Sequence, residues 1–134
     1  MAQTKDPVRY VVTTEKSPDT AQKDLEAAVA ERKFSVLHVY DLKATLKEKG
    51  VDLREEARVL EICNASQADK VLRTDIGMNL ALPCRVSIWQ QDGSTWIGMV
   101  RPKAMLRMLS DSKPLQAIAD EVERTLIEIV EAAR

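Results

Sequence analysis

The sequence predicts an α+β fold in which a five-stranded, largely antiparallel sheet is covered on one face by two long helices. Five short segments rich in β-branched and aromatic residues alternate with segments of helical periodicity. The turn Gln91-Asp92-Gly93-Ser94 joins two of these segments, and its Asp-Gly pair indicates an antiparallel hairpin. The order strand, helix, strand, short helix, strand, helix, hairpin, two helices is typical of α+β proteins.

The five strand segments share a high content of Val, Ile, Tyr, Thr and Trp. In chain order they are Val8–Thr14, Phe34–Tyr40, Arg58–Asn64, Cys84–Gln90 and Thr95–Arg101. Several carry apolar residues at both odd and even positions, whereas strands with one solvated face alternate more cleanly. We therefore expect the face without long helices to be buried by a second copy of the chain or to hold a ligand cavity. The alternative is that loops and short helices cover this face.

The two long helices each have one apolar face. The first begins at Ser17-Pro18, where a capping serine precedes a first-turn proline, and its periodicity ends near Arg32 or Lys33. The second begins at Ser112 and carries a continuous apolar stripe to the end of the chain. Because each helix has a single apolar stripe, we expect both to lie on the same side of the sheet.

Shorter elements complete the predicted fold. Asp41 caps a short helix that ends at Gly50, Ser66 caps a two-turn helix, and Pro102 begins another short helix. The connection Met78–Pro83 is apolar without a clear period. An exposed apolar segment of this kind usually marks a contact, in a small protein most simply with a second copy of the chain.

Composition excludes several classes of function. The chain has 134 residues, which we interpret as a single domain over 1–134, with 20 basic and 21 acidic side chains. This balance provides no basic field for nucleic acid and no polybasic membrane anchor. The apolar stretches are far shorter than the roughly 20 residues that span a bilayer, and Met1–Tyr10 is polar where a secretory signal is apolar. We therefore expect a cytoplasmic protein that binds neither nucleic acid nor membranes.

No sequence motif identifies a catalytic centre. The sequence contains neither a GxGxxG loop nor a Walker motif nor a GxSxG elbow, and a single histidine would have to serve any base role. Most acidic residues fall on the polar faces of predicted helices. The sequence leaves enzymatic activity undecided and favours a non-catalytic protein.

Cys63 and Cys84 are the first candidates for site chemistry. If the third and fourth strands are antiparallel neighbours, both cysteines lie at the same rim of the sheet. A thiol pair there would bind a soft metal such as copper(I), or cycle between dithiol and disulfide. The alternative is that both are small apolar side chains in the core. Too few Cys and His residues are present for a four-ligand zinc site, and we predict no cofactor.

His38 and Glu61 are the other candidate site residues. Glu61 shares the parity of Cys63 in the third strand, and His38 lies on the second strand with Tyr40 on its own face. Antiparallel geometry places His38 away from Cys63, with Glu61 between them. A row of His38, Glu61 and Cys63 would line a site. The alternative for a lone strand histidine is a hydrogen-bonded residue of the core or rim.

Two further groups have a functional and a structural interpretation. Basic side chains on two short helices would form a patch for an anionic ligand, or only a solvated face; they are Lys43, Lys47, Lys49, Lys103 and Arg107. Methionines would form a soft-metal site or an adaptable groove, or simply fill the core; they are Met78, Met99, Met105 and Met108. In both cases the structural interpretation is favoured.

Four segments resemble the domain-of-unknown-function 302 family. They are Asp41–Gly50, Leu60–Asn64, Leu82–Cys84 and Pro102–Leu106, and together with the element order they cover nearly the whole chain. The resemblance implies a small bacterial or archaeal α+β domain that forms dimers, and it brings no established reaction. One departure is Ala65, which follows Cys63-Asn64 where the family commonly has proline.

The sequence as a whole favours a homodimeric protein that binds a small ligand or a partner. The alternative function is a thiol-dependent metal-binding or redox protein that uses Cys63 and Cys84.

Overall fold

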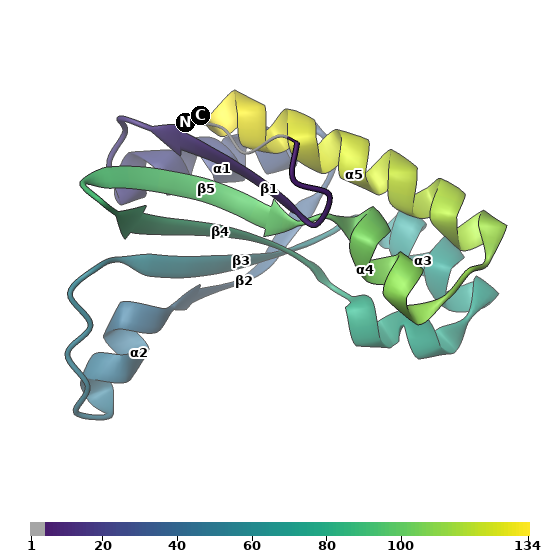
Figure 1. The fold of residues 1–134 in the computed structure, drawn as a ribbon, viewed down its shortest axis with the longest axis horizontal. Helices are drawn as coiled ribbons and strands as arrows, with labels where there is room; N and C mark the ends of the chain where they lie inside the picture. The colour runs from purple at the N-terminus through teal and green to yellow at the C-terminus, as the bar shows by residue number, and fades with distance from the viewer. Residues whose placement is uncertain (1–4) are drawn as a thin grey trace.

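A computed structural model describes residues 5–134, and the α+β prediction is confirmed (Figure 1). The first four residues of the segment Met1–Tyr10, on which the export argument rests, lie outside the described residues. The strands are β1 (Arg9–Thr14), β2 (Ser35–Asp41), β3 (Ala57–Cys63), β4 (Cys84–Gln91) and β5 (Ser94–Val100). The helices are α1 (Pro18–Glu31), α2 (Leu42–Glu48), α3 (Ala65–Thr74), the 3-10 helix η1 (Ile76–Ala81), α4 (Pro102–Leu109) and α5 (Lys113–Ala133).

The five strands form one antiparallel sheet in the order β1-β5-β4-β3-β2. β4 and β5 form the predicted hairpin, and its two-residue loop has positive φ angles at both Asp92 (51°) and Gly93 (77°). Positive φ at both central positions is the geometry of a type I′ turn, whose twist matches that of the strands. In the strand order, β4 is the central strand and β5 lies between β4 and β1.

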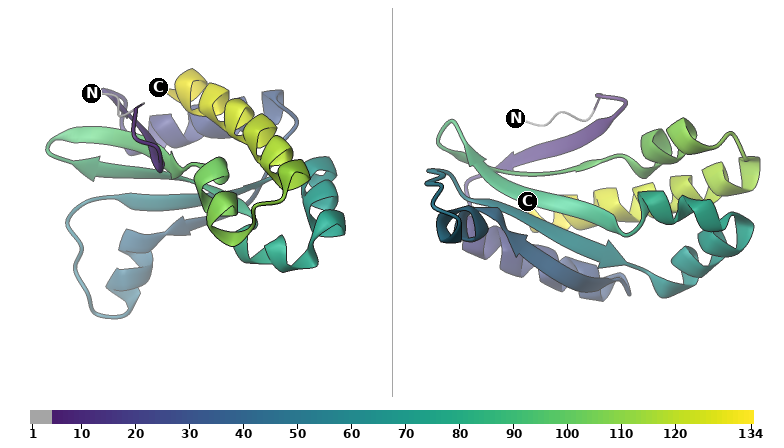
Figure 2. Two further views of the ribbon diagram at one scale, coloured as in Figure 1. Left: turned by 45° about the vertical axis from the view of Figure 1, so that its right-hand side comes forward. Right: turned by 90° about the horizontal axis from the view of Figure 1, so that it is seen from below.

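The main core lies between the sheet and the two long helices. α1 packs against α5, and in Figure 1 α1 lies behind the sheet and α5 above it. Fully buried side chains from both layers meet there, among them Leu25, Leu60, Ile88, Ile97 and Leu126. As predicted, both long helices cover the same face of the sheet, and the turned views in Figure 2 show the same layering.

A smaller apolar cluster lies beyond the end of the sheet. It forms where α3, η1, α4 and the first part of α5 meet (Figure 1), and its members are Val71, Met78, Leu106, Leu115 and Ala119. Ile118 of α5 packs against both this cluster and the main core. The two apolar clusters therefore meet near the ends of β4 and β5.

Two local predictions were wrong. Helix α3 is capped by Asn64 and not by Ser66, because the Asn64 side chain accepts the Gln67 N–H at 3.0 Å. The segment Met78–Pro83 was expected to be a connection without a regular period, but its first part belongs to η1, where Met78 is only 5% exposed. Only one side of η1 remains open to solvent.

A bulge in β2 corrects one argument for a second buried face. The register between β2 and β3 shifts between Val36 and His38. Val36 and Val39 consequently both pack against the main core, while Leu37 is 57% exposed. The apolar residues at both odd and even positions of β2 are therefore explained by the bulge, and they do not indicate that both faces of the strand are buried.

In β4 and β5, by contrast, apolar residues do occur on both faces. Ile88 and Ile97 lie in the main core. On the opposite face, Trp89 and Trp96 stack with their ring centroids 6.2 Å apart, and Val100 is 46% exposed. No helix crosses the front of the sheet in Figure 1. We call this surface the open face, and it is neither uniformly polar nor covered by α1 or α5.

Candidate functional site

The central strands β4 and β5 separate halfway along their length. Their ladder ends at Ser87–Gly98, although β4 continues along β3 to Cys84 and β5 continues along β1 to Val100. Beyond the ladder, β4 connects to η1 and β5 leads into α4. The sheet is therefore split between two strands that remain paired on their outer sides.

The split changes the surroundings of two peptide groups. The Gln90 N–H donates to the carbonyl of Glu56, just before β3, and the Arg101 N–H donates to the carbonyl of Val8, just before β1. Because bonding directions alternate along an antiparallel strand, the peptide groups of Arg85 and Val100 point toward each other's strand. If the register that joins Ser87 to Gly98 continued, Arg85 and Val100 would form the next hydrogen-bonded pair. Instead, both residues line a pocket.

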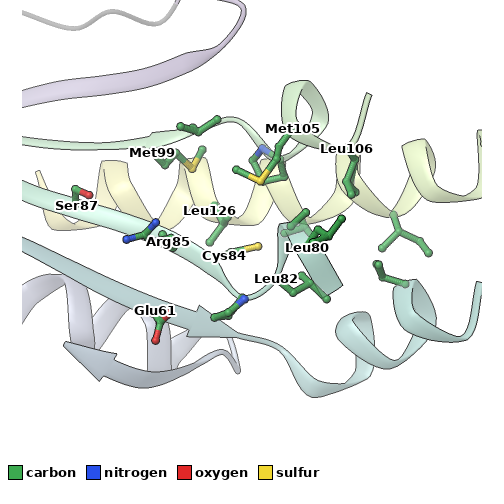
Figure 3. Close-up of a pocket in the computed structure, with 18 residues that line it drawn as sticks. Glu61, Leu80, Leu82, Cys84, Arg85, Ser87, Met99, Met105, Leu106 and Leu126 are labelled. Atoms are coloured by element: carbon green, nitrogen blue, oxygen red, sulfur yellow. The ribbon is translucent and has the colours of Figure 1, made fainter. Parts of the chain in front are cut away.

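This pocket has a volume of about 430 Å³ and extends from the split toward α5 (Figure 3). Its walls come from β4, β5, η1, α4 and α5, with one contribution each from α3 and β3. Most of the lining is aliphatic or sulfur-containing, including Leu82, Cys84, Met99, Met105, Leu106 and Leu126. A mainly apolar pocket of this size, with few polar groups, is typical of small-molecule sites.

Three polar side chains line the mouth of the pocket, namely Glu61, Arg85 and Ser87. Alternation along β3 and β4 places them on the open face, opposite the core residues Leu60 and Val86. Glu61 accepts a hydrogen bond of 3.2 Å from the Tyr40 hydroxyl. The side chains of Arg85 and Ser87 make no hydrogen bond or ion pair with any of residues 5–134.

Cys84 lies inside the pocket. Burial raises the pKa of its thiol from 9.0 to about 11, and the charge of Cys63 adds to the rise. At neutral pH the group is therefore a thiol and not a thiolate. Met99 and Met105 place two further sulfur atoms in the same pocket (Figure 3).

The two cysteines lie at the same rim of the sheet, as the strand order predicted. Cys84 is the register partner of Ile62, the residue next to Cys63. Side chains alternate along β3, so Cys63 faces the side opposite Ile62, whereas Cys84 packs with Ile62 against the main core. Both cysteines are free, and only Cys84 lines the pocket.

His38 and Glu61 are direct cross-strand neighbours. The register pairs His38 with Glu61 and Ser35 with Cys63. The His38 ring lies 4.4 Å from the Tyr40 ring, as their shared parity predicted. Glu61 lines the pocket and His38 does not. Of the four candidate residues, the pocket contains Cys84 and Glu61.

The basic side chains do not form one patch. Lys43, Lys47 and Lys49 belong to α2 and the turn after it, at the opposite end of the molecule from α4, which carries Lys103 and Arg107 (Figure 1). Lys103 also forms an ion pair of 3.2 Å with an aspartate of α5. The functional interpretation of this group is therefore not supported.

Two further features, a cluster of metal ligands and a membrane-spanning helix, are absent from the described residues. Within residues 5–134, no cluster of three or more His, Cys, Asp or Glu side chains is arranged to hold a metal ion. Over the same range, none of the helices combines the length and apolar character that crossing a membrane requires.

Sequence reasoning missed the split and the residues that border it. Arg85 appears in the sequence as an ordinary surface position, whereas Leu80 lies in the segment Met78–Pro83 that was predicted to make a contact. A strand ladder that ends early has no local pattern. Two prolines were a usable signal, because Pro83 directly precedes β4 and Pro102 directly follows β5. Proline lacks an N–H and does not continue a ladder.

Comparison with known proteins gives a family and a structural neighbour. The family model for "Domain of unknown function DUF302" matches residues 10–133. The chain is similar to a solved structure, the crystal structure of an uncharacterized conserved DUF302 protein from Bacillus stearothermophilus. The two share 28% sequence identity and a TM-score of 0.91, over 96% of this chain and 100% of that chain. No curated protein matches.

Proposed function

The chain belongs to the DUF302 family, whose function is unknown, and we propose that it is a non-catalytic protein that binds a small, mainly apolar ligand in the pocket between β4 and β5. The observation that carries this proposal is the early end of the β4–β5 ladder. It opens a pocket of about 430 Å³ between two otherwise well-packed apolar clusters.

Two features support a binding role over a packing defect. Three of the four segments that resemble the family contribute to the lining. The residues that do so are Glu61, Leu82, Pro83, Cys84, Pro102, Met105 and Leu106. Residues of both apolar clusters form its walls, and the pocket is already open in the structure without any rearrangement of the backbone. Pre-formed apolar pockets with a few polar groups at one end are the usual form of ligand sites.

A matched pair of variants on η1 tests the proposal. Leu80 is 78% exposed and lines the pocket, whereas Ile76 is 71% exposed and does not line it. Decan-1-ol serves as an apolar probe, and its affinity is measured by titration calorimetry. We expect Leu80→Asp to weaken binding about tenfold and Ile76→Asp to leave it unchanged.

Both positions are exposed, so neither substitution is expected to affect folding. An unmodified protein that binds no decan-1-ol would overturn the proposal. Equal effects of the two substitutions would place the binding site elsewhere on the chain.

We further propose that the protein acts as a homodimer whose interface includes the open face. Trp89 and Trp96 stack on this face, and Val100, which lines the pocket, is 46% exposed on it. Exposed apolar side chains grouped on one face are typical of contact surfaces. A second copy seated there would also cover the mouth.

The sulfur atoms in the pocket favour a second candidate function. Cys84, Met99 and Met105 come from three elements and provide one thiol and two thioethers, which are ligands that copper(I) prefers. Titration with copper(I) distinguishes this candidate. A soft-metal site requires binding that Cys84→Ser abolishes and Cys63→Ser preserves.

A further inference from the structure

We propose that the ligand is an aliphatic amphiphile with an anionic head group, of which a fatty carboxylate is the simplest example. Its chain would lie in the pocket, and Arg85 and Ser87 would bind its head group at the mouth. This inference rests on the proposed function and specifies the chemistry of its ligand.

The interior of the pocket fits an aliphatic chain. None of the side chains that line it is aromatic, and those around α4 and α5 are aliphatic or thioether groups, such as Met105, Leu106 and Leu126. Flexible thioethers adapt to apolar groups of varied shape. The charged and hydroxyl side chains of the lining come only from β3 and β4, at the mouth. A molecule that matches this distribution is apolar along its length and polar at one end.

The mouth has unused hydrogen-bond donors and a partly occupied acceptor. Arg85 and Ser87 lie two residues apart on β4, so their side chains extend from the same face (Figure 3). Within the described part of the chain, neither side chain makes a hydrogen bond or an ion pair, although Glu61 is the cross-strand neighbour of Arg85. Glu61, the acidic side chain of the lining, already accepts the Tyr40 hydroxyl proton in a hydrogen bond.

The type of donor favours an anion with two or more oxygen atoms. A guanidinium presents parallel N–H groups that bind a carboxylate through two hydrogen bonds, and a neighbouring hydroxyl adds a third donor. The peptide N–H of Arg85, which points into the split, lies at the same position in the chain. Arg85 therefore supplies the charge and the geometry that select an acidic head group over an alcohol.

The test compares probes that share one chain and differ in the head group. Decanoate, decan-1-ol and decyltrimethylammonium are titrated into the full chain by calorimetry. We expect decanoate to bind about tenfold more tightly than decan-1-ol at low salt, with the difference shrinking as salt is added.

Arg85→Ala is expected to remove this difference by weakening decanoate alone. The matched control is Arg107→Ala, because Arg107 is an exposed arginine of α4 that does not line the pocket. Ser87→Ala should produce a smaller loss in the same direction. Arg85 is exposed, so its substitution is not expected to alter folding.

The outcomes separate this inference from the proposed function. Equal binding of decanoate and decan-1-ol, or tighter binding of decyltrimethylammonium, would overturn the anionic head group and leave the apolar pocket as a ligand site. Loss of decanoate binding in both arginine variants would also overturn it, since the effect would then be one of general charge. If no probe binds, the proposed function fails as well.

Discussion

The environment of Cys84 determines what this residue does chemically. Its thiol lies among apolar pocket walls, and burial raises its pKa to about 11. Nucleophilic attack, disulfide exchange and metal binding all use the thiolate, which is scarce under these conditions at neutral pH. In the absence of a metal ion, Cys84 therefore acts as an apolar lining residue, and this favours ligand binding over redox chemistry.

The raised pKa predicts a pH dependence of stability that belongs to Cys84. Between pH 9 and about 11 the folded state keeps the thiol proton while the unfolded state loses it. The unfolded state then binds fewer protons, so the free energy of unfolding falls as pH rises through this window, by about 2 to 3 kcal/mol in total. Urea unfolding between pH 8 and pH 11 measures this decrease.

Cys84→Ala should lack this part of the decrease, and Cys63→Ala should retain most of it, because burial is the larger cause of the raised pKa. The comparison is needed because the pKa of Tyr10 is also raised, to about 12, by burial and by its hydrogen bond to Glu131. The part of the free energy of unfolding that depends on Tyr10 falls between pH 10 and pH 12 in both variants. Identical pH profiles for the two cysteine variants would contradict the assignment to Cys84.

At the level of elements, Glu123 connects the two helices that form one wall of the pocket. It is 9% exposed on α5, forms an ion pair of 3.2 Å with Arg101, and accepts the backbone N–H of Lys103 at 3.1 Å. Arg101 is the N-cap of α4 and has no capping side-chain bond of its own. A carboxylate from α5 therefore satisfies the first turn of α4 and fixes the position of that helix.

Glu123→Gln is predicted to lower the free energy of unfolding by about 2 kcal/mol, because it removes the charge from a largely buried ion pair while Arg101 keeps its hydrogen bond to the Asp6 carbonyl. It should also weaken decan-1-ol binding, since α4 and α5 both line the pocket. Chemical denaturation and calorimetry measure the two effects. Glu121→Gln, an exposed position on the same helix, is the control, and similar losses in both variants would contradict the role of Glu123.

The elements that sequence reasoning predicted well are those that local chemistry determines. Ser17, Asp41 and Ser112 cap helices as expected, and Asp92-Gly93 forms the hairpin turn. The caps differ at α3, where Asn64 and Ser66 are both good capping residues and only the fold selects Asn64. A local pattern cannot decide which of two nearby residues with similar capping preferences caps the helix.

The candidate site was harder to predict because it depends on the register of distant strands. Parity along β3 identified Glu61 and Cys63 as neighbours on one face, but the face of Cys84 followed only from its pairing with Ile62. The bulge at Leu37 also has no local signal in a strand of mixed apolar residues. The pocket itself arises where a ladder ends, and no single segment contains that information.

For the whole molecule, the open face and the mouth of the pocket are parts of one surface. Trp89 of β4 and Trp96 and Val100 of β5 lie on the face of the sheet opposite the layer that α1 and α5 form. Association of two copies through this face would remove apolar side chains from water, and the gain grows with the apolar area buried. It would also restrict exchange of a bound ligand with the solvent.

This arrangement predicts the mass of the particle in solution. Light scattering at micromolar concentration should give twice the 15.0 kDa of one chain. Val100→Lys places a charge on the open face, where a second copy would have to desolvate it, and should shift the mass toward that of one chain. Val100 is 46% exposed in the single chain, so this shift would not reflect loss of folding.

Met108→Lys is the matched control for the predicted dimer. Met108 is 84% exposed on α4 and not on the sheet, so the substituted protein should keep the double mass. Dissociation by both lysine substitutions would indicate a general effect of charge. A single-chain mass for the unmodified protein would show that the open face does not bind a second copy, while the pocket behind it would still be available to a ligand.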